Sequence, residues 1–302
     1  MALGTNHVTN TTGATFIPEL WSDEIIAAYK QNLVMANLVS KMSFKGKKGD
    51  TLHIPKPTRG AASLKAASNQ VTLQAATESE VQVLVNKHYE YSRLIEDITE
   101  VQALASLRKF YTGDAGYALA KQVDTDLLQL GRGVQGGNGT VAYDKAVIAS
   151  DGATLYTGTN EDAITDAGIR RVIQTLDDAD VPMDGRVLVL PPVARNVMMG
   201  LARFTEQAFV GEVGGGNTIR NGEIGNVYGV KVFVTTNADT STAGDRVGLM
   251  FTKDAFVLAE QMGVRSQTQY KQEYLGTLFT SDMLYGVKEL RDEAAVAIAM
   301  PA

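Results

Sequence analysis

Residues 131–136 read Gly-Arg-Gly-Val-Gln-Gly, a literal match to the Gly-x-Gly-x-x-Gly pattern that binds the pyrophosphate of dinucleotides. In that chemistry the glycine turn follows a strand and opens a helix, so that backbone amides and the helix N-terminus point at the phosphates. Here residues 115–130 have the spacing of a helix, and another glycine-rich loop follows at 137–139. The context favours a helix end over a nucleotide site. We therefore expect no cofactor.

Aspartates gather at two places where carboxylates could bind a metal ion or transfer protons. Four lie between residues 177 and 184, but they lack the Asp-x-Asp-x-Asp-Gly spacing of a calcium loop. They follow a predicted helix over 162–179, which favours a solvated helix end. Asp124 and Asp126 are two residues apart on another predicted helix and so lie on different faces. Neither group predicts a paired-carboxylate catalytic site.

Cysteine and histidine chemistry is equally sparse. The chain has no cysteine, which excludes disulfides, thiolate metal ligands and cysteine nucleophiles, and fits a reducing compartment. Its three histidines, His7, His53 and His88, are far apart in the sequence and predict neither a metal pair nor a catalytic dyad. We expect no catalytic residues, no metal site and no enzyme activity.

Composition places these residues in an ordinary folded chain. The 302 residues are 44% hydrophobic and 21% charged, which suits one or two domains with a sizeable core. The N-terminus lacks a basic region followed by an apolar one, and no run approaches the ~20 apolar residues that span a bilayer. We expect neither a signal peptide nor contact with a membrane.

The strongest structural signal is a long hairpin predicted over residues 45–92. Apolar and polar residues alternate on both sides, and Pro55 and Pro57 are expected to end the ladder on the outgoing side. The tip at 58–70 is small and polar, with Leu64 as its one large apolar residue. At ~3.3 Å per residue such strands reach roughly 35 Å. A projection of this kind is costly to order in a monomer, so we interpret it as an assembly arm.

Charge supports this interpretation. Residues 41–65 hold seven Lys or Arg and one Asp, a local balance of +6, and because the whole chain is −6 the other residues together carry −12. An acidic surface on an identical copy could therefore receive Lys56, Arg59 and Lys65. A solvated basic loop is the plain alternative. Nucleic-acid binding is less favoured, because the segment has a single aromatic residue for stacking.

The remaining elements form a mixed α and β pattern. Apolar residues from Trp21 onward recur at helical spacing and predict a face that packs in the core or on another subunit. A capping box at 97–100 starts a helix that is expected to break at 112–114, before a second, spine-like helix at 115–130. The second half predicts an α/β unit with helices at 162–179 and 194–201, and strands at 186–190, 229–234, 247–251, 283–290 and 294–299.

Several segments, in this order and spacing, resemble the major capsid proteins of tailed bacteriophages, whose fold was first described for phage Hong Kong ninety-seven. The resemblance covers almost the whole chain. The segments that carry it are 16–22 (Phe-Ile-Pro-Glu-Leu-Trp-Ser), 32–39, 49–55, 180–182, 185–192, 221–225 and 228–232.

This resemblance implies an α+β fold with the capsid architecture. Residues 1–40 would be an N-terminal arm and its helix, and 41–92 the extended β-hairpin called the E-loop. Residues 93–142 and 279–302 would form the peripheral (P) domain with the spine helix, and 143–278 the axial (A) domain. The expected inter-subunit contacts are, on the E-loop, Lys56, Arg59, Leu64 and Lys65, and, on the N-terminal arm, Phe16 and Trp21.

The implied function is structural. Copies of the chain would assemble as hexamers and pentamers into an icosahedral shell that encloses double-stranded phage DNA without sequence-specific binding. About 15 residues precede Phe16, so a separate scaffolding protein is expected. The other expected partners are a portal protein and, in some relatives, a cement or decoration protein. The chain would be made and assembled in the bacterial cytoplasm and located in the virion.

Two points stay open at this level. An encapsulin-like bacterial compartment, which encloses cargo enzymes, has the same fold and is the alternative function. Some relatives crosslink an E-loop Lys to an Asn of a neighbour. Lys56 and Lys65 are both candidates here, but no Asn or assisting Glu is identified, so we assign no crosslink.

Overall fold

The computed structural model describes residues 33–43, 45–46, 48–56, 60–71, 73, 78–102, 107–137, 143–201 and 225–302. Helices and strands are mixed along the chain, which confirms the predicted α+β class. The helices are α1 (Met35–Leu38), α2 (Asp97–Gln102), α3 (Leu107–Gln129), α4 (Asp166–Asp178) and α5 (Pro192–Met199), with short 3-10 turns η2 (Leu130–Arg132), η3 (Val134–Gly136), η4 (Lys253–Ala255), η5 (Gln272–Tyr274) and η6 (Asp292–Ala294).

The strands build three sheets. A six-stranded sheet has the order β5-β12-β9-β6-β8-β7, a four-stranded sheet the order β1-β10-β11-β4, and β2 and β3 form a separate hairpin. The strands are β1 (Ser40–Ser43), β2 (Thr51–Lys56), β3 (Ser79–Leu84), β4 (Lys87–Glu96), β5 (Val147–Ile148), β6 (Arg186–Leu190), β7 (Asn226–Val227), β8 (Val230–Val234), β9 (Arg246–Thr252), β10 (Phe256–Lys271), β11 (Gly276–Glu289) and β12 (Ala295–Met300).

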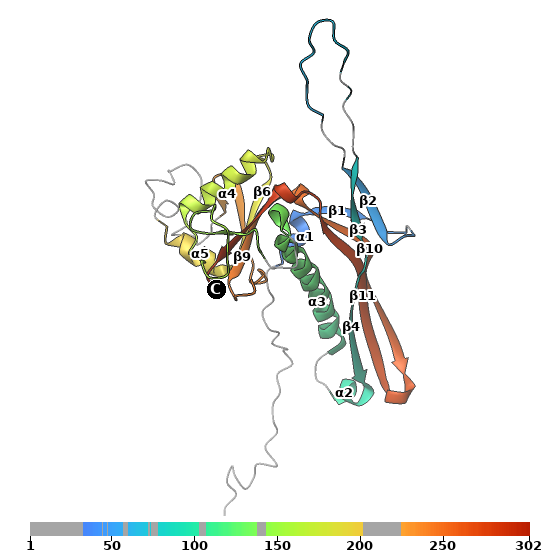
Figure 1. Cartoon of the computed structure of the whole chain (residues 1–302). Coiled ribbons are helices and arrows are strands. Elements are labelled where there is room, and N and C mark those ends of the chain that lie inside the picture. The colour runs from blue at the N-terminus through green and yellow to red at the C-terminus, as the bar shows by residue number, and fades with distance from the viewer. Residues whose placement is uncertain are drawn as a thin grey trace, which may run out of the picture.

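The six-stranded sheet is the centre of the core and has helices on both faces (Figure 1). Alternate residues of β12 divide between the faces: Ala295, Ala297 and Ala299 belong to the cluster with α3, whereas Val296 and Ile298 belong to the cluster with α4 and α5. This period of two is the geometry of a strand. Because both faces are covered, β6 and β12 are apolar along nearly their whole length.

The four-stranded sheet is long and narrow, and α3 runs along it (Figure 1). β10 and β11 pair in antiparallel fashion from Phe256 opposite Glu289 to Lys271 opposite Gly276. β4 then pairs with β11, and β1 pairs in parallel with β10. α2 lies beside the far end of this sheet, where the backbone amide of Asp97 donates to the carbonyl of Leu275 at 2.9 Å.

This pairing corrects the domain division expected from the sequence. The expected boundary at 278 would cut β11 and separate β10 from the strand with which it pairs. Residues 295–300 were expected in the P domain, but β12 pairs with β9 inside the six-stranded sheet. Sheet membership depends on hydrogen bonds between distant segments, and the order of elements along the chain does not fix it.

The spine helix is also longer than predicted. α3 continues without a break through 112–114, where the sequence predicted an interruption. A mid-helix glycine costs about 1 kcal/mol relative to alanine. Burial of Ala115, Leu119, Val123 and Leu127 on the inner face outweighs that cost. No helix in the described part of the chain is long and apolar enough to span a membrane.

Candidate assembly surfaces

The projecting arm has two parts, a paired root and an exposed tip. The arm root is the β2–β3 hairpin, in which six residue pairs run from Thr51 opposite Leu84 to Lys56 opposite Ser79. Pro55 lies inside this ladder, so the expectation that it ends the strand is wrong. Proline is tolerated there because no other strand of the described residues pairs with the outer side of β2, where the missing N–H is not needed.

The arm root packs on its own subunit, which the sequence did not predict. Val83 is 0% exposed and belongs to an apolar cluster with Val257 and Ala259 of β10. Leu52 and Ile54 of β2 pack against the same cluster. The apolar residues of the hairpin are therefore covered within the subunit at the arm root. The exposed tip is the part of the arm that is left to contact another molecule.

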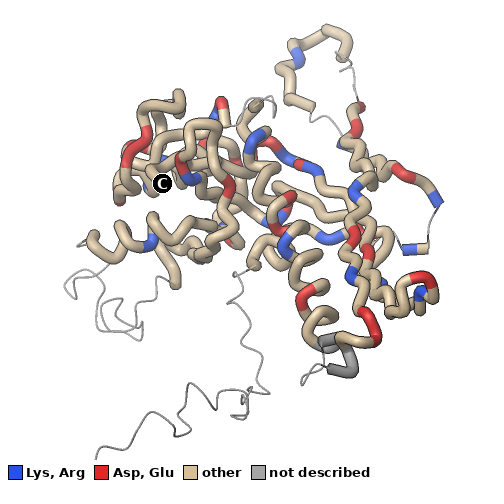
Figure 2. The backbone as a smooth tube through the Cα atoms, turned by 90° about the horizontal axis from the view of Figure 1, so that it is seen from below, with Lys and Arg blue, Asp and Glu red and all other residues tan. Residues whose placement is uncertain are grey.

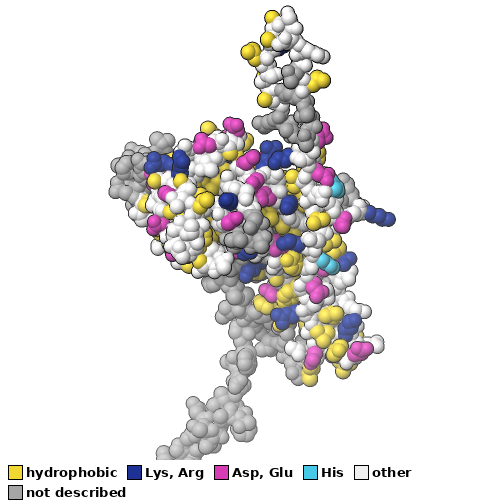
Figure 3. Space-filling view, in the orientation of Figure 1, with side chains coloured by type: hydrophobic (Ala, Val, Ile, Leu, Met, Phe, Trp, Pro, Cys, Tyr) yellow, Lys and Arg dark blue, Asp and Glu magenta, His cyan; other side chains and the backbone are white. Residues whose placement is uncertain are grey.

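The arm tip, the described residues between 60 and 73, has no helix or strand and is exposed throughout. Leu64 and Leu73 are fully exposed, and Figure 3 shows hydrophobic side chains at the end of the projection. Lys65 is exposed beside Leu64. Arg59 lies outside the described residues. An apolar and basic tip that buries nothing in its own subunit is a surface suited to a partner.

The basic residues around the arm divide into paired and unpaired groups. Lys45 Nζ lies 3.1 Å from Glu260 Oε1, and Lys41 Nζ donates to Asn37 Oδ1 at 3.3 Å. Within the described part of the chain, Lys48, Lys56 and Lys65 form no ion pair. Acidic and basic positions are interspersed over the body of the subunit (Figure 2). Among the described residues in this view, the acidic positions are spread out and do not form one acidic face.

The N-terminal contacts Phe16 and Trp21 lie outside the described residues. The described part of this segment begins just before α1, which is fixed to the spine by the buried Asp124. The Oδ1 atom of Asp124 accepts hydrogen bonds from the amides of Val34 and Met35 at 3.1 and 2.8 Å, and its Oδ2 accepts from Asn237 Nδ2 at 3.1 Å. Burial raises the pKa of Asp124, and these hydrogen bonds offset part of that rise.

Replacing Asp124 with alanine should destabilise the subunit by roughly 2 kcal/mol or more, because the two buried amides of Val34 and Met35 lose their carboxylate acceptor. Asp178→Ala, on the exposed end of α4, is the matched control and should change stability by less than about 0.5 kcal/mol. Chemical denaturation followed by circular dichroism measures both. Equal free energies of unfolding for the two variants would contradict this role of Asp124.

The second helical carboxylate, Asp126, takes part in a different network. It accepts from Tyr285 Oη at 2.6 Å and lies 3.0 Å from Lys87 Nζ. Burial and the neighbouring carboxylate raise the pKa of Tyr285, so this phenol stays protonated as the donor. As predicted, Asp124 and Asp126 serve different faces of α3. Each joins the spine to another element, and they do not act as a catalytic pair.

The glycine pattern at 131–136 lies in the context that the sequence indicated. It follows α3, contains the turns η2 and η3, and opens no helix of its own. A Cβ atom on Gly131 would lie 2.4 Å from the Leu249 side chain, so this glycine allows close packing on the six-stranded sheet. Gln135 Nε2 donates to the carbonyl of Ala295 at 2.9 Å. These contacts explain the turn without a phosphate.

Asp177 and the two described histidines, which the sequence analysis considered for chemistry, also have structural partners. At the end of α4, Asp177 Oδ1 lies 2.7 Å from the buried Arg186 guanidinium. His53 contacts Glu80 at 2.9 Å across the arm root, and His88 contacts Asp282 at 3.2 Å. Within the ranges that the structure describes, no three His, Cys, Asp or Glu side chains are arranged to hold a metal ion.

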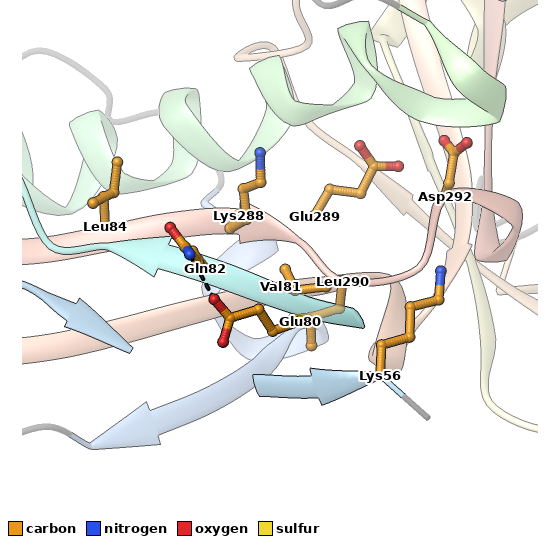
Figure 4. A pocket seen from close by; sticks show the side chains of 9 residues that line it. All are labelled: Lys56, Glu80, Val81, Gln82, Leu84, Lys288, Glu289, Leu290 and Asp292. Atoms are coloured by element: carbon orange, nitrogen blue, oxygen red, sulfur yellow. Dashed lines mark hydrogen bonds between the residues drawn. The ribbon is translucent and has the colours of Figure 1, made fainter. Parts of the chain in front are cut away.

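One hollow separates the arm root from the body of the subunit (Figure 4). Its volume is ≈ 530 Å³. Burial and the adjacent Asp292 raise the pKa of Glu289 to about 7 in its wall. No sequence motif indicated this place, because its walls come from segments some two hundred residues apart. Its charged residues are Lys56 and Glu80 from the arm root and Lys288, Glu289 and Asp292 from the body.

Comparison with known protein families matches residues 16–300 to the family described as phage capsid protein. No curated protein sequence is significantly similar to this chain. Among solved structures, a chain from Mycobacterium phage Che8 has a TM-score of 0.74 and 25% identity, with 94% of this chain and 97% of that one covered.

Two cyanophage capsid structures agree with the fold. The capsid of cyanophage P-SCSP1u matches with a TM-score of 0.77 at 18% identity, covering 99% of this chain and 96% of that one. The capsid of cyanophage Pam1 matches with a TM-score of 0.73 at 14% identity, covering 99% of both chains. The predicted Hong Kong ninety-seven type architecture is confirmed. The chain belongs to the phage capsid protein family and is a structural capsid protein of a tailed bacteriophage.

Proposed function

We propose that copies of this chain assemble as hexamers and pentamers into an icosahedral shell around double-stranded phage DNA. The observation that carries this proposal is the exposed arm tip, in which Leu64, Lys65 and Leu73 bury nothing in their own subunit. Membership of the capsid family supports it. The same evidence gives no support to the encapsulin alternative.

The roles of the parts follow from this assignment. The N-terminal residues 1–40 and the arm at 41–92 would reach neighbouring subunits, with Phe16, Trp21, Lys56, Arg59, Leu64 and Lys65 as contacts. The four-stranded sheet with α3 would be the P domain, and the six-stranded sheet the A domain. A separate scaffolding protein and a portal protein would be partners during assembly in the bacterial cytoplasm, and the shell in the virion would take a decoration protein if this phage, like some relatives, has one. We propose no catalytic activity and no membrane contact for the chain.

Self-assembly can be tested directly on the purified chain. Co-expression with its scaffolding protein should give particles that sediment far faster than a 32.4 kDa monomer and appear as closed shells in negative-stain images. Particles from infected cells that contain DNA would identify a shell around a genome, whereas particles that contain protein cargo would identify an enzyme compartment. A chain that remains monomeric in the presence of its scaffold would contradict the proposal.

A further inference from the structure

Two buried carboxyl groups line the same hollow where the arm leaves the body. Glu289, the last residue of β11, lies beside Asp292 of η6, and burial together with this neighbouring carboxyl raises the pKa of Glu289 to about 7. Glu289 Oε1 and Asp292 Oδ1 are themselves buried and have no hydrogen-bond partner. We call these two residues the carboxyl pair. Loss of its proton would leave two adjacent anions with unsatisfied oxygens.

The glycine turn at 131–136 packs against this pair and contributes no charge to balance it. A Cβ atom on Gly133 would lie 3.1 Å from Glu289 Oε2, and one on Gly136 would lie 3.7 Å from Asp292 Oδ2. Arg132 in the same turn is engaged elsewhere, because its guanidinium makes two hydrogen bonds to Asp239 at 2.8 and 3.2 Å. Compensation for an ionised pair must therefore come from the hollow.

Two cations face the hollow from opposite sides. Lys288 belongs to the same strand as Glu289, and its charge lowers the pKa of Glu289 less than burial and Asp292 raise it. Lys56 is the last residue of β2 and extends from the arm side toward Asp292 (Figure 4). Neither lysine forms an ion pair in the described structure. The other charged groups nearby are Glu80 on β3 and, flanking Asp292 on the outside, the exposed Arg291 and Glu293.

We propose that the carboxyl pair and Lys56 form a proton-controlled switch that sets the position of the arm root on the body. With Glu289 protonated, the pair carries one negative charge fewer and the hollow is open. When the proton passes to bulk water, the doubly charged pair draws in the Lys56 ammonium, and the Lys56 end of the β2–β3 hairpin closes on the body while Val83 stays packed in its apolar cluster. This inference concerns a single subunit and does not depend on shell assembly.

The direction of the pH dependence follows from the pKa of Glu289. Its value rises from 4.5 to about 7 on folding, so the folded state holds the proton more tightly than the unfolded chain. The protonated form of Glu289 predominates below about pH 7 and the ionised form above it, so low pH favours the open arrangement and higher pH the closed one. The arm root should therefore move with a midpoint near pH 7.

The absence of cysteine allows this movement to be measured on the full chain. Ala62→Cys in the arm tip and Met183→Cys on the exposed turn after α4 provide two labelling sites. Labelled chains are diluted into unlabelled ones, so that energy transfer reports distances within one subunit. We expect the transfer efficiency to change in a single step between pH 5.5 and 8.5, with its midpoint near 7.

Two variants separate this switch from other titrating groups. Glu289→Gln removes the titration and should hold the efficiency at its low-pH value, whereas Lys56→Met, on the exposed arm, should fold normally and remove the movement. Lys288→Met and Glu80→Gln are controls that should keep the step. A constant efficiency in the parent chain, or a step that persists in Lys56→Met, would overturn the proposal. If Glu289→Gln does not fold, the lysine variant alone decides.

Discussion

Replacing Lys56, Arg59 and Lys65 together by glutamate is expected to abolish shell assembly and leave the subunit folded. The change turns the local balance of residues 41–65 from +6 to neutral, because three cations become three anions. Lys56 and Lys65 are exposed and unpaired in the described structure, so they contribute little to folding stability. Charges at the edge of an interface steer association, and reversing all three replaces attraction by repulsion, so association should slow by at least about tenfold at low salt and no shells should form.

The measurement compares particle yield by sedimentation with folding by circular dichroism. A charge-matched control reverses Arg171, Lys231 and Lys253, which are exposed on α4, β8 and η4. The control should assemble, and raising the ionic strength should slow assembly of the parent chain. Normal assembly of the arm variant, or an equal defect in the control, would show that the arm does not meet an acidic neighbour.

Elements with a strong local signal were predicted well. Residues 186–190 were predicted as a strand and are β6, because an apolar run covered on both faces has few alternatives. The helix predicted at 162–179 is α4 at Asp166–Asp178, where the Thr165 side chain accepts from the amide of Gly168 at 3.0 Å. A helix cap and the helical spacing of apolar residues involve residues close together in the chain, so the sequence alone is enough to predict them.

β10 was missed because its strand conformation comes from its partner. Beyond Gly263 it is polar and exposed, with no alternation of apolar residues. Pairing with β11 holds it extended. The burial of the arm root on Val257 and Ala259 was missed for the same reason, since two hundred residues separate the strands that meet there.

The candidate functional residues also divide into those that the local sequence predicted and those whose partners lie far away in the chain. The tip at 58–70 was recognisable because it has little to bury, and its described residues, 60–70, are exposed. Asp124 and Asp126 were correctly placed on different faces of α3, yet their partners Asn237 and Tyr285 lie more than a hundred residues away and had no local signature. The carboxyl pair Glu289–Asp292 likewise became visible only with the hollow that it lines.

Gly286→Ala is expected to be among the most damaging single substitutions in the described structure. A Cβ atom at this position of β11 would lie 2.2 Å from the carbonyl oxygen of Leu84 and 3.1 Å from the Cα atom of Val85. These are backbone atoms of the link between β3 and β4, so no side-chain rotation relieves the overlap. The link must move, and overpacking of this kind costs roughly 1–3 kcal/mol or more.

Gly113→Ala is the matched control, because it adds the same atom to α3 where nothing lies within 4 Å. It should stabilise the subunit by roughly 0.5–1 kcal/mol through helix propensity. Chemical denaturation compares the two free energies of unfolding. The displaced link carries the arm root, so Gly286→Ala should also lower particle yield under conditions where the subunit is still folded. Equal stabilities for the two variants, with normal shells from Gly286→Ala, would mean that the arm root tolerates displacement and that its packing on β11 does not position the arm.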